Sequence, residues 1–136
     1  IILGEYGIQG SRHASILKLW LSLYLIGKKK YAEMIDLNME ITQLFTDYIT
    51  QSKELQLYAQ PDTNIILFRP TRGADQTAED YHALIADFQQ YLYANNRYIS
   101  LLTWEGEPWL KCIFLNPYFG KRELISLQHL IAQFFK

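Results

Sequence analysis

The chain has 136 residues, enough for one domain with a real hydrophobic core. With 49% apolar and 15% aromatic residues, its composition excludes an intrinsically disordered protein. Its formal net charge of -1 provides no long-range attraction for polyanions, so nucleic acid is not expected as a partner.

A first helix is predicted close to the N-terminus. Glycines at positions 4, 7 and 10 disfavour a helix over residues 1–10, which we expect to be extended or looped. Ser11 or Ser15 can cap a helix that runs to Ile26, and Gly27 stops it there. This helix is apolar on most sides, as expected of a helix buried between layers.

A longer second helix is predicted over residues 31–52. Its apolar residues recur at spacings of three and four and therefore share one face. The three lysines 28–30 precede this helix, and we expect them to form a solvated connector between the two helices. The apolar stripe consists of Met34, Leu37, Ile41, Leu44 and Tyr48.

The middle and C-terminal parts of the chain predict four strands in two antiparallel pairs. The first pair covers residues 55–59 and 65–68, with turn residues between the strands. The second pair covers 98–104 and 109–115 and is joined by a turn at 105–108, which contains Gly and Pro.

Two further helices complete the predicted domain. One covers residues 78–94 and follows a capping pattern in which Thr77 precedes Asp80 by three positions. The last covers about residues 122–135. Hairpins that alternate with local helices favour an α+β domain whose antiparallel sheet is covered by helices on one face.

The cysteine content and the hydropathy of the sequence indicate in which cellular compartment the protein is expected. Cys112 is the only cysteine, so no disulfide framework is possible, which favours a reducing, cytoplasmic location. No apolar run reaches the roughly 18 residues of a membrane span, and we expect no membrane partner. The chain starts with IILG rather than with methionine, so we expect it to be a piece of a longer polypeptide.

Most chemical signatures are absent from the sequence. It contains no phosphate-binding glycine loop, no dinucleotide fingerprint and no nucleophile elbow. His13, His82 and His129 are widely separated, so no metal site is expected. Cys112 has no histidine nearby and is expected to be a buried core thiol rather than a nucleophile.

Lys111 is a charged residue in an otherwise apolar predicted strand, where it lies between Leu110 and Cys112. The alternation of a strand puts its side chain on the same face as Trp109 and Ile113. A lysine in such surroundings needs an acidic partner or an anionic ligand.

The segment from Gln9 to His13 leads directly into the first predicted helix. The Ser11 side chain, the N–H groups of the first turn and the Arg12 guanidinium together suit an anion. An ordinary helix cap beside a surface arginine explains the same residues equally well.

Residues 8–20, IQGSRHASILKLW, resemble the stretch that follows the cofactor lysine in group II pyridoxal-phosphate-dependent amino acid decarboxylases. This family includes enzymes that act on glutamate, aromatic amino acids, histidine and 2,4-diaminobutyrate. Its pattern is matched by SRH at 11–13 and KLW at 18–20. Residues 110–117, which end in Asn-Pro before the last helix, are similar to the family's penultimate strand.

The resemblance implies roles for four residues of this chain. Ser11 is expected to approach the phosphate of pyridoxal 5'-phosphate in the partner subunit of a homodimer, while Arg12 and His13 order the loop. Lys111 stands where glutamate-type members carry an arginine that contacts the substrate's α-carboxylate. Lysine keeps that charge but loses the bidentate geometry, so the resemblance implies that Lys111 binds the substrate carboxylate with a single ammonium group.

The resemblance also implies that residues 1–136 form the C-terminal small domain of a fold type I enzyme. Connecting helices would occupy about residues 1–52, and the small α+β domain about residues 53–136. The Schiff-base lysine would lie upstream, in the cofactor-binding domain that is this fragment's partner. Alone, the chain would therefore have no catalytic residue, bind no cofactor and be inactive.

Two other hypotheses remain open at this point. The chain could be a free-standing, non-catalytic small domain that acts in assembly or regulation, which the lysine at position 111 favours. It could also belong to another fold type I enzyme, such as an aminotransferase, although the spacing of SRH and KLW disfavours this.

Overall fold

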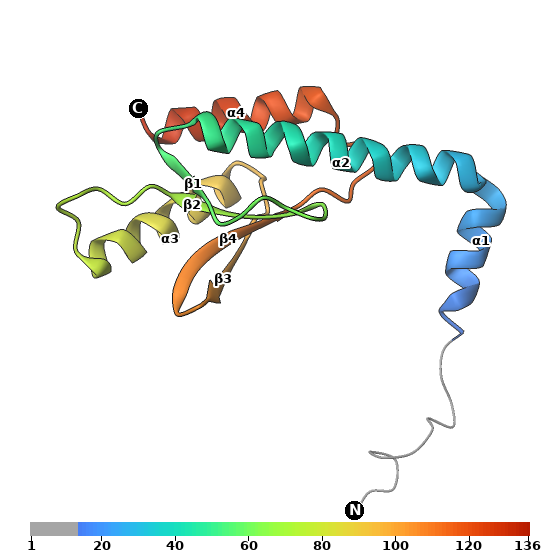
Figure 1. Ribbon diagram of the computed structural model, residues 1–136, viewed down its shortest axis with the longest axis horizontal. Helices are drawn as coiled ribbons and strands as arrows, with labels where there is room; N and C mark the ends of the chain where they lie inside the picture. Colours follow the sequence, from blue (N-terminus) through green and yellow to red (C-terminus); the bar gives the residue numbers. More distant parts are fainter. Residues whose placement is uncertain (1–13) are drawn as a thin grey trace, which may run out of the picture. The chain divides into compact units, whose positions relative to one another are not determined.

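The computed structural model describes residues 14–136. The chain divides into two units, one that ends at Met34 and one that comprises Ile35–Lys136, and each is described by itself (Figure 1). The elements in chain order are α1 (Ile16–Ile26), α2 (Lys28–Gln51), β1 (Leu55–Leu57), β2 (Ile65–Pro70), α3 (Ala78–Ala94), β3 (Ser100–Trp104), β4 (Glu107–Ile113) and α4 (Lys121–Phe134).

In the first unit, Gly27 separates α1 from α2. Its φ of +83° favours glycine, and its N–H donates to the Leu23 carbonyl at 3.0 Å, which ends α1. Ser15 precedes α1, but its side chain makes no capping hydrogen bond. Contrary to expectation, none of the residues of α1 is buried.

The predicted lysine connector is wrong, because residues 28–30 form the first turn of α2. One glycine with positive φ is enough to change the chain direction, and the Tyr31 N–H donates to the Gly27 carbonyl at 3.1 Å. An ion pair of 3.1 Å between Lys30 and Glu33 offsets part of the unfavourable positive charge at this helix N-terminus.

The second unit contains one antiparallel sheet with the strand order β1-β2-β4-β3. Both predicted pairs are confirmed, since β1 pairs with β2 and β3 pairs with β4. The central ladder between β2 and β4 joins the two hairpins into one sheet, with Phe68 opposite Leu110 and Ile66 opposite Cys112.

The second hairpin has a tighter turn than predicted. Glu105 and Gly106 both have positive φ, at 52° and 80°, as a two-residue hairpin turn requires. Trp104 therefore pairs with Glu107, and β4 begins two residues earlier than the sequence suggested. Pro108 lies within this strand, where a proline had suggested a longer loop.

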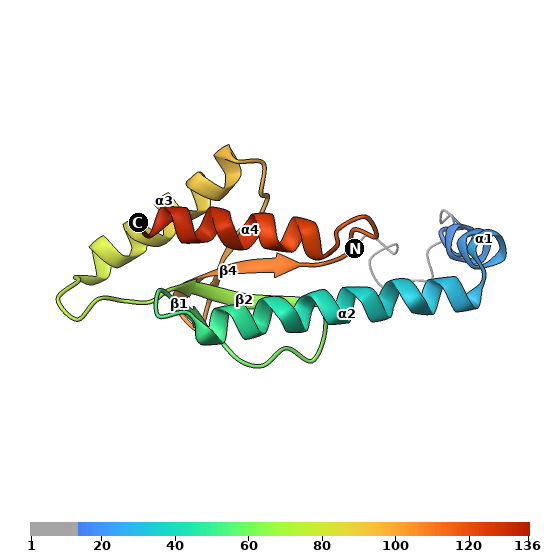
Figure 2. The same cartoon turned by 90° about the horizontal axis from the view of Figure 1, so that it is seen from above.

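The core lies between the sheet and the helices, which cover one face of it (Figures 1 and 2). Phe45 of α2 packs edge-on against Phe68 of β2 and Phe114, with ring centroids 5.4 and 5.7 Å apart. Phe88 of α3 approaches Phe68 at 6.4 Å. From α4, the buried residues are Leu124, Leu127 and Ile131. The predicted α+β fold is therefore confirmed.

Polar contacts fix the helices of the second unit. The Tyr48 hydroxyl of α2 donates to the Gln128 carbonyl of α4 at 3.1 Å, and the two helices lie side by side (Figure 2). At the start of α3, the Thr77 hydroxyl accepts from the Asp80 N–H at 3.1 Å, as the capping pattern predicted. Within residues 14–136, no helix is both long and apolar enough to cross a membrane.

Candidate functional site

Three of the four predicted site residues, Ser11, Arg12 and His13, lie outside the described residues. Their expected roles at a cofactor phosphate therefore stay predictions. Lys111 is described, and the candidate site is built around it.

Lys111 lies in the middle of β4, one of the two central strands. It pairs with Leu67 of β2 and with Ser100 of β3. Its neighbours along the strand, Leu110 and Cys112, are buried in the core beneath the helices. The half-buried Lys111 side chain therefore belongs to the opposite face of the sheet. We call this the outer face; it carries Leu67, Arg69, Ser100, Leu102, Glu107, Trp109, Lys111 and Ile113.

Arg69 is the second cation of the outer face. Its guanidinium carbon lies 4.0 Å from the centre of the Trp109 ring, a cation–π arrangement. Its Nη1 pairs with Glu107 at 2.9 Å, and its Nε donates to the Gln56 side chain at 3.1 Å. Arg69 therefore already has a carboxylate partner, which engages its Nη1.

Aromatic residues surround Trp109 on the same face. The Tyr58 ring meets it edge-on with centroids 5.2 Å apart, and the Trp104 indole N–H donates to the Tyr58 hydroxyl at 3.0 Å. Trp109 is consequently only 5% exposed, although it points away from the helices. Sequence reasoning missed this cluster because it ended the strand at residue 68, whereas β2 continues to residue 70 and so includes Arg69.

The charges of the outer face leave Lys111 available. Among residues 14–136, the ion pairs join Lys30 to Glu33, Arg69 to Glu107, and Lys121 to Glu40, and none includes Lys111. Glu107, the outer-face carboxylate among the described residues, is paired with Arg69 and lies four residues from Lys111 along β4, about 13 Å away. The sequence had indicated an acidic partner or an anionic ligand for this lysine, and the described residues supply no acidic partner.

The other candidates from the sequence are two histidines and the cysteine. His82 and His129 are exposed. No three His, Cys, Asp or Glu side chains within residues 14–136 converge to hold a metal. Cys112 is 7% exposed, and burial raises the pKa of its thiol to about 12, which confirms the expected inert core thiol.

The buried thiol makes stability sensitive to alkaline pH. An unfolded cysteine has a pKa of about 8.5, so the unfolded chain releases this proton first as the pH rises. The pKa of about 12 in the folded chain means that stability falls between these two values, by up to about 1.4 kcal/mol per pH unit. We expect the Cys112→Ala variant to lack this loss.

Urea unfolding of both chains at several pH values measures the difference in the free energy of unfolding. That difference should shrink as the pH rises above about 8.5. A difference that stays constant over the alkaline range would show that the thiol ionises equally in both states.

Comparisons with known proteins agree with this fold. Residues 3–71 match the family model described as "Pyridoxal-dependent decarboxylase conserved domain". An L-2,4-diaminobutyrate decarboxylase from Acinetobacter baumannii is 34% identical over 62 residues, which is 46% of this chain and 12% of the relative. The chain thus corresponds to a small part of that protein's length.

Solved structures show the same fold over most of the chain. The glutamate decarboxylase domain of a Vibrio parahaemolyticus diaminobutyrate-pyruvate transaminase and L-2,4-diaminobutyrate decarboxylase superposes with a TM-score of 0.69 and 23% identity, over 87% of this chain and 25% of that one. The 4-hydroxyphenylacetaldehyde synthase of Rhodiola rosea gives a TM-score of 0.79 and 13% identity, over 98% of this chain and 29% of that one.

The likeness to solved structures supports the fold, and the family match covers more than half of the residues. It includes the first helices and the segment that carries SRH and KLW. The chain belongs to the pyridoxal-dependent decarboxylase family.

Proposed function

We propose that the chain is the C-terminal part of a pyridoxal-phosphate-dependent amino acid decarboxylase and is inactive alone, because the lysine that holds the cofactor lies in a preceding part of the polypeptide. The observation that carries this proposal is the family match at residues 3–71, together with a fold that recurs in about a quarter of each solved relative. The proposal includes a homodimer in the cytoplasm.

In the proposed enzyme, this chain contributes to binding rather than to bond breaking. Pyridoxal phosphate supplies the electron sink for loss of CO2 when it is bound. Ser11 would donate its hydroxyl to the cofactor phosphate of the partner subunit, and Arg12 and His13 would hold the loop in place. These three roles rest on the match of SRH at 11–13 to the family pattern.

Lys111 would bind the α-carboxylate of the amino acid substrate. The Lys111 residue is half-buried and makes no ion pair within the described structure, whereas the neighbouring cation Arg69 is paired with Glu107. A single ammonium provides charge without a fixed fork, so it would hold a carboxylate with less control over its orientation than an arginine does.

The full-length protein tests the proposed activity. Purified with pyridoxal phosphate, it should be yellow and release CO2 from an amino acid, whereas the 136-residue chain given the same cofactor should do neither. A full-length protein that is colourless and inactive would contradict the proposal and favour an assembly or regulatory role. Amine transfer without CO2 release would point to an aminotransferase.

Substitution of Lys111 in the full-length enzyme tests its role. Lys111→Gln should raise KM for the amino acid by roughly tenfold to a hundredfold, because a hydrogen bond to a charged group is lost, with a smaller effect on kcat. Lys111→Arg should keep KM near that of the parent enzyme. The exposed Lys53→Gln is the matched control, and an unchanged KM for Lys111→Gln would remove Lys111 from the substrate site.

A further inference from the structure

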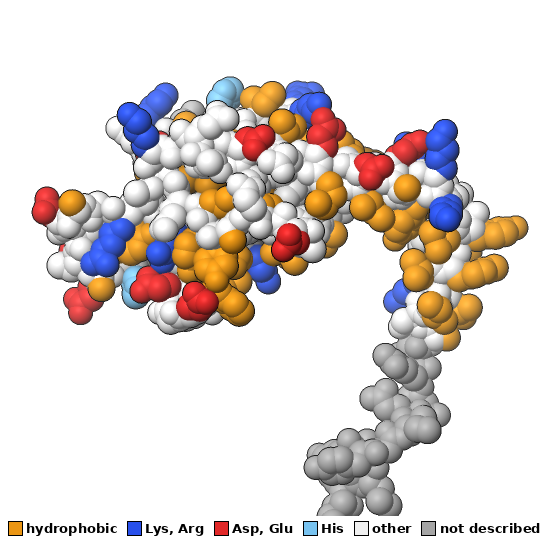
Figure 3. Space-filling view, in the orientation of Figure 1, with side chains coloured by type: hydrophobic (Ala, Val, Ile, Leu, Met, Phe, Trp, Pro, Cys, Tyr) orange, Lys and Arg blue, Asp and Glu red, His pale blue; other side chains and the backbone are white. Residues whose placement is uncertain are grey.

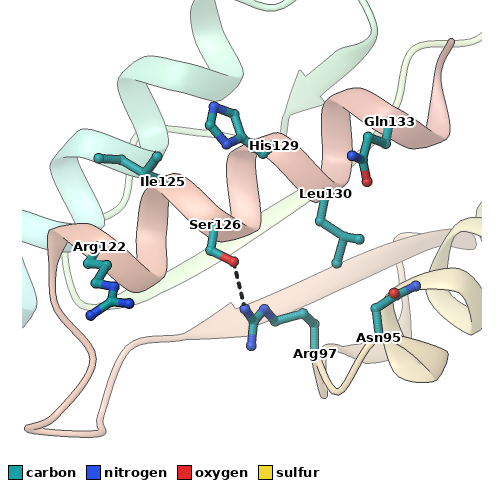
Figure 4. Close-up of a pocket in the computed structure, with 8 residues that line it drawn as sticks. All are labelled: Asn95, Arg97, Arg122, Ile125, Ser126, His129, Leu130 and Gln133. Atoms are coloured by element: carbon teal, nitrogen blue, oxygen red, sulfur yellow. Dashed lines mark hydrogen bonds between the residues drawn. The ribbon is translucent and has the colours of Figure 1, made fainter.

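A second concentration of positive charge lies on the helical side of the second unit. A cavity of about 430 Å³ opens between the end of α3 and one side of α4. The residues at positions 122, 126 and 130 follow one another at four-residue spacing, so they share the side of α4 that faces Asn95 and Arg97 (Figure 4). His129 also borders the cavity, but its ring points away from Arg97 in that view.

The guanidinium of Arg97 is only partly satisfied. Its Nη2 donates to the Ser126 hydroxyl at 3.0 Å, while its buried Nε has no hydrogen-bond acceptor (Figure 4). Neither Arg97 nor Arg122 takes part in an ion pair within residues 14–136. A partly buried cation without a counter-ion is unfavourable, and an anion in the cavity would relieve this cost.

No carboxylate lines the cavity to fill that role. Glu123 is the acidic residue whose charge is felt by both arginines, but its Oε2 accepts from the Gly120 N–H at 2.9 Å at the start of α4. That hydrogen bond, more than the arginines, lowers the pKa of Glu123. The Glu123 carboxylate is therefore engaged away from the cavity.

We propose that this cavity binds a phosphate group, either as inorganic phosphate or as the monoester of a small molecule. The guanidiniums of Arg97 and Arg122 and the Ser126 hydroxyl can donate to an oxyanion at one end of the cavity, while Asn95 and Gln133 line its other end. A phosphate offers several acceptor oxygens and up to two charges, which suits paired arginines better than a single carboxylate does. This site is independent of the proposed decarboxylase function.

Titration of the 15N-labelled 136-residue chain with sodium phosphate tests the proposal, with sodium chloride at equal ionic strength as reference. Amides near Asn95, Arg97 and Ser126 should shift saturably with phosphate alone. Arg122→Gln should weaken binding by about tenfold, as expected for loss of one charge-assisted hydrogen bond. Arg97→Lys keeps the charge and loses the fork, and it should weaken binding as well.

Lys29→Gln provides the control, since it removes one exposed positive charge that lines no part of the cavity. Binding that is unaffected by this change but weakened by Arg122→Gln supports the site. The proposal is overturned if chloride reproduces the shifts, if phosphate leaves these amides unmoved, or if all three variants weaken binding equally. A titration with glycerol phosphate distinguishes the two ligands. If glycerol phosphate binds more tightly than inorganic phosphate, the ligand is a phosphate monoester; if it binds more weakly, the ligand is inorganic phosphate.

Discussion

Replacing Phe45 with alanine should lower the free energy of unfolding by about 4 kcal/mol. Phe45 is fully buried in α2 and meets Phe68 and Phe114 edge-on, with ring centroids 5.4 and 5.7 Å away. It also stacks on Tyr48 at 6.1 Å. Its removal leaves a cavity where α2 meets the sheet, and a domain of this size is typically stable by only about 5–15 kcal/mol.

Leu44→Ala is the matched control, because Leu44 precedes Phe45 in the same helix and is 37% exposed. It should cost less than about 1 kcal/mol. Urea unfolding followed by far-ultraviolet circular dichroism measures both variants. If both variants lower the free energy of unfolding equally, Phe45 does not anchor α2 to the sheet.

The sequence predicted every element of the second unit, because each has a clear local signal. The spacing of apolar residues in α3 and α4 and the alternation in β4 depend on contacts that recur along one segment. In α2 the helix was predicted, but the predicted apolar stripe included the exposed Leu44 and missed the buried Phe45 and Ile49. The Thr77 cap is equally local, since it needs only residues three positions apart. Local sequence patterns of this kind predict an element correctly when the tertiary structure favours the same local conformation.

The errors arose where one or two residues form a turn for which a longer segment was predicted. At Gly27 a single positive φ replaces a connector, and at Glu105-Gly106 a two-residue turn replaces a loop of four. The β2–β4 ladder was not predicted because it joins strands separated by α3. Pairing at that distance depends on which core residues meet, such as Phe68 and Leu110, rather than on any short motif.

The candidate site was predicted in part. Strand alternation put Lys111 on the face of Trp109, and the ladder places it there. Alternation says nothing about partners, however, and it gave no reason to expect that Arg69 pairs with Glu107 or that Lys111 makes no ion pair within residues 14–136. The Arg69–Glu107 contact depends on β2 and β4 lying side by side, which only the folded chain shows.

Self-association of the 136-residue chain is the second large effect that we expect, and α1 is its cause. Its large apolar side chains are all exposed, from 39% for Leu23 to 73% for Tyr24, and Figure 3 shows them gathered on this helix. Patches of this kind favour association, because burying apolar surface contributes about 25 cal/mol per Å². We expect sedimentation velocity to show oligomers whose share grows with concentration.

Changing Leu17, Leu21 and Leu25 together to glutamine should weaken this association at least about a hundredfold, since each buried leucine contributes about 1.5–3 kcal/mol. The three are spaced by four and lie on one side of α1, so the helix itself can persist. A triple control replaces Tyr98, Tyr118 and Ile125, which are 71%, 89% and 51% exposed in the second unit. If the chain sediments as a monomer at every concentration, it does not associate through α1. If the triple control variant abolishes association as strongly as the leucine variant, the association does not depend on α1 in particular. If the leucine variant alone becomes monomeric, α1 is the surface through which the chain associates.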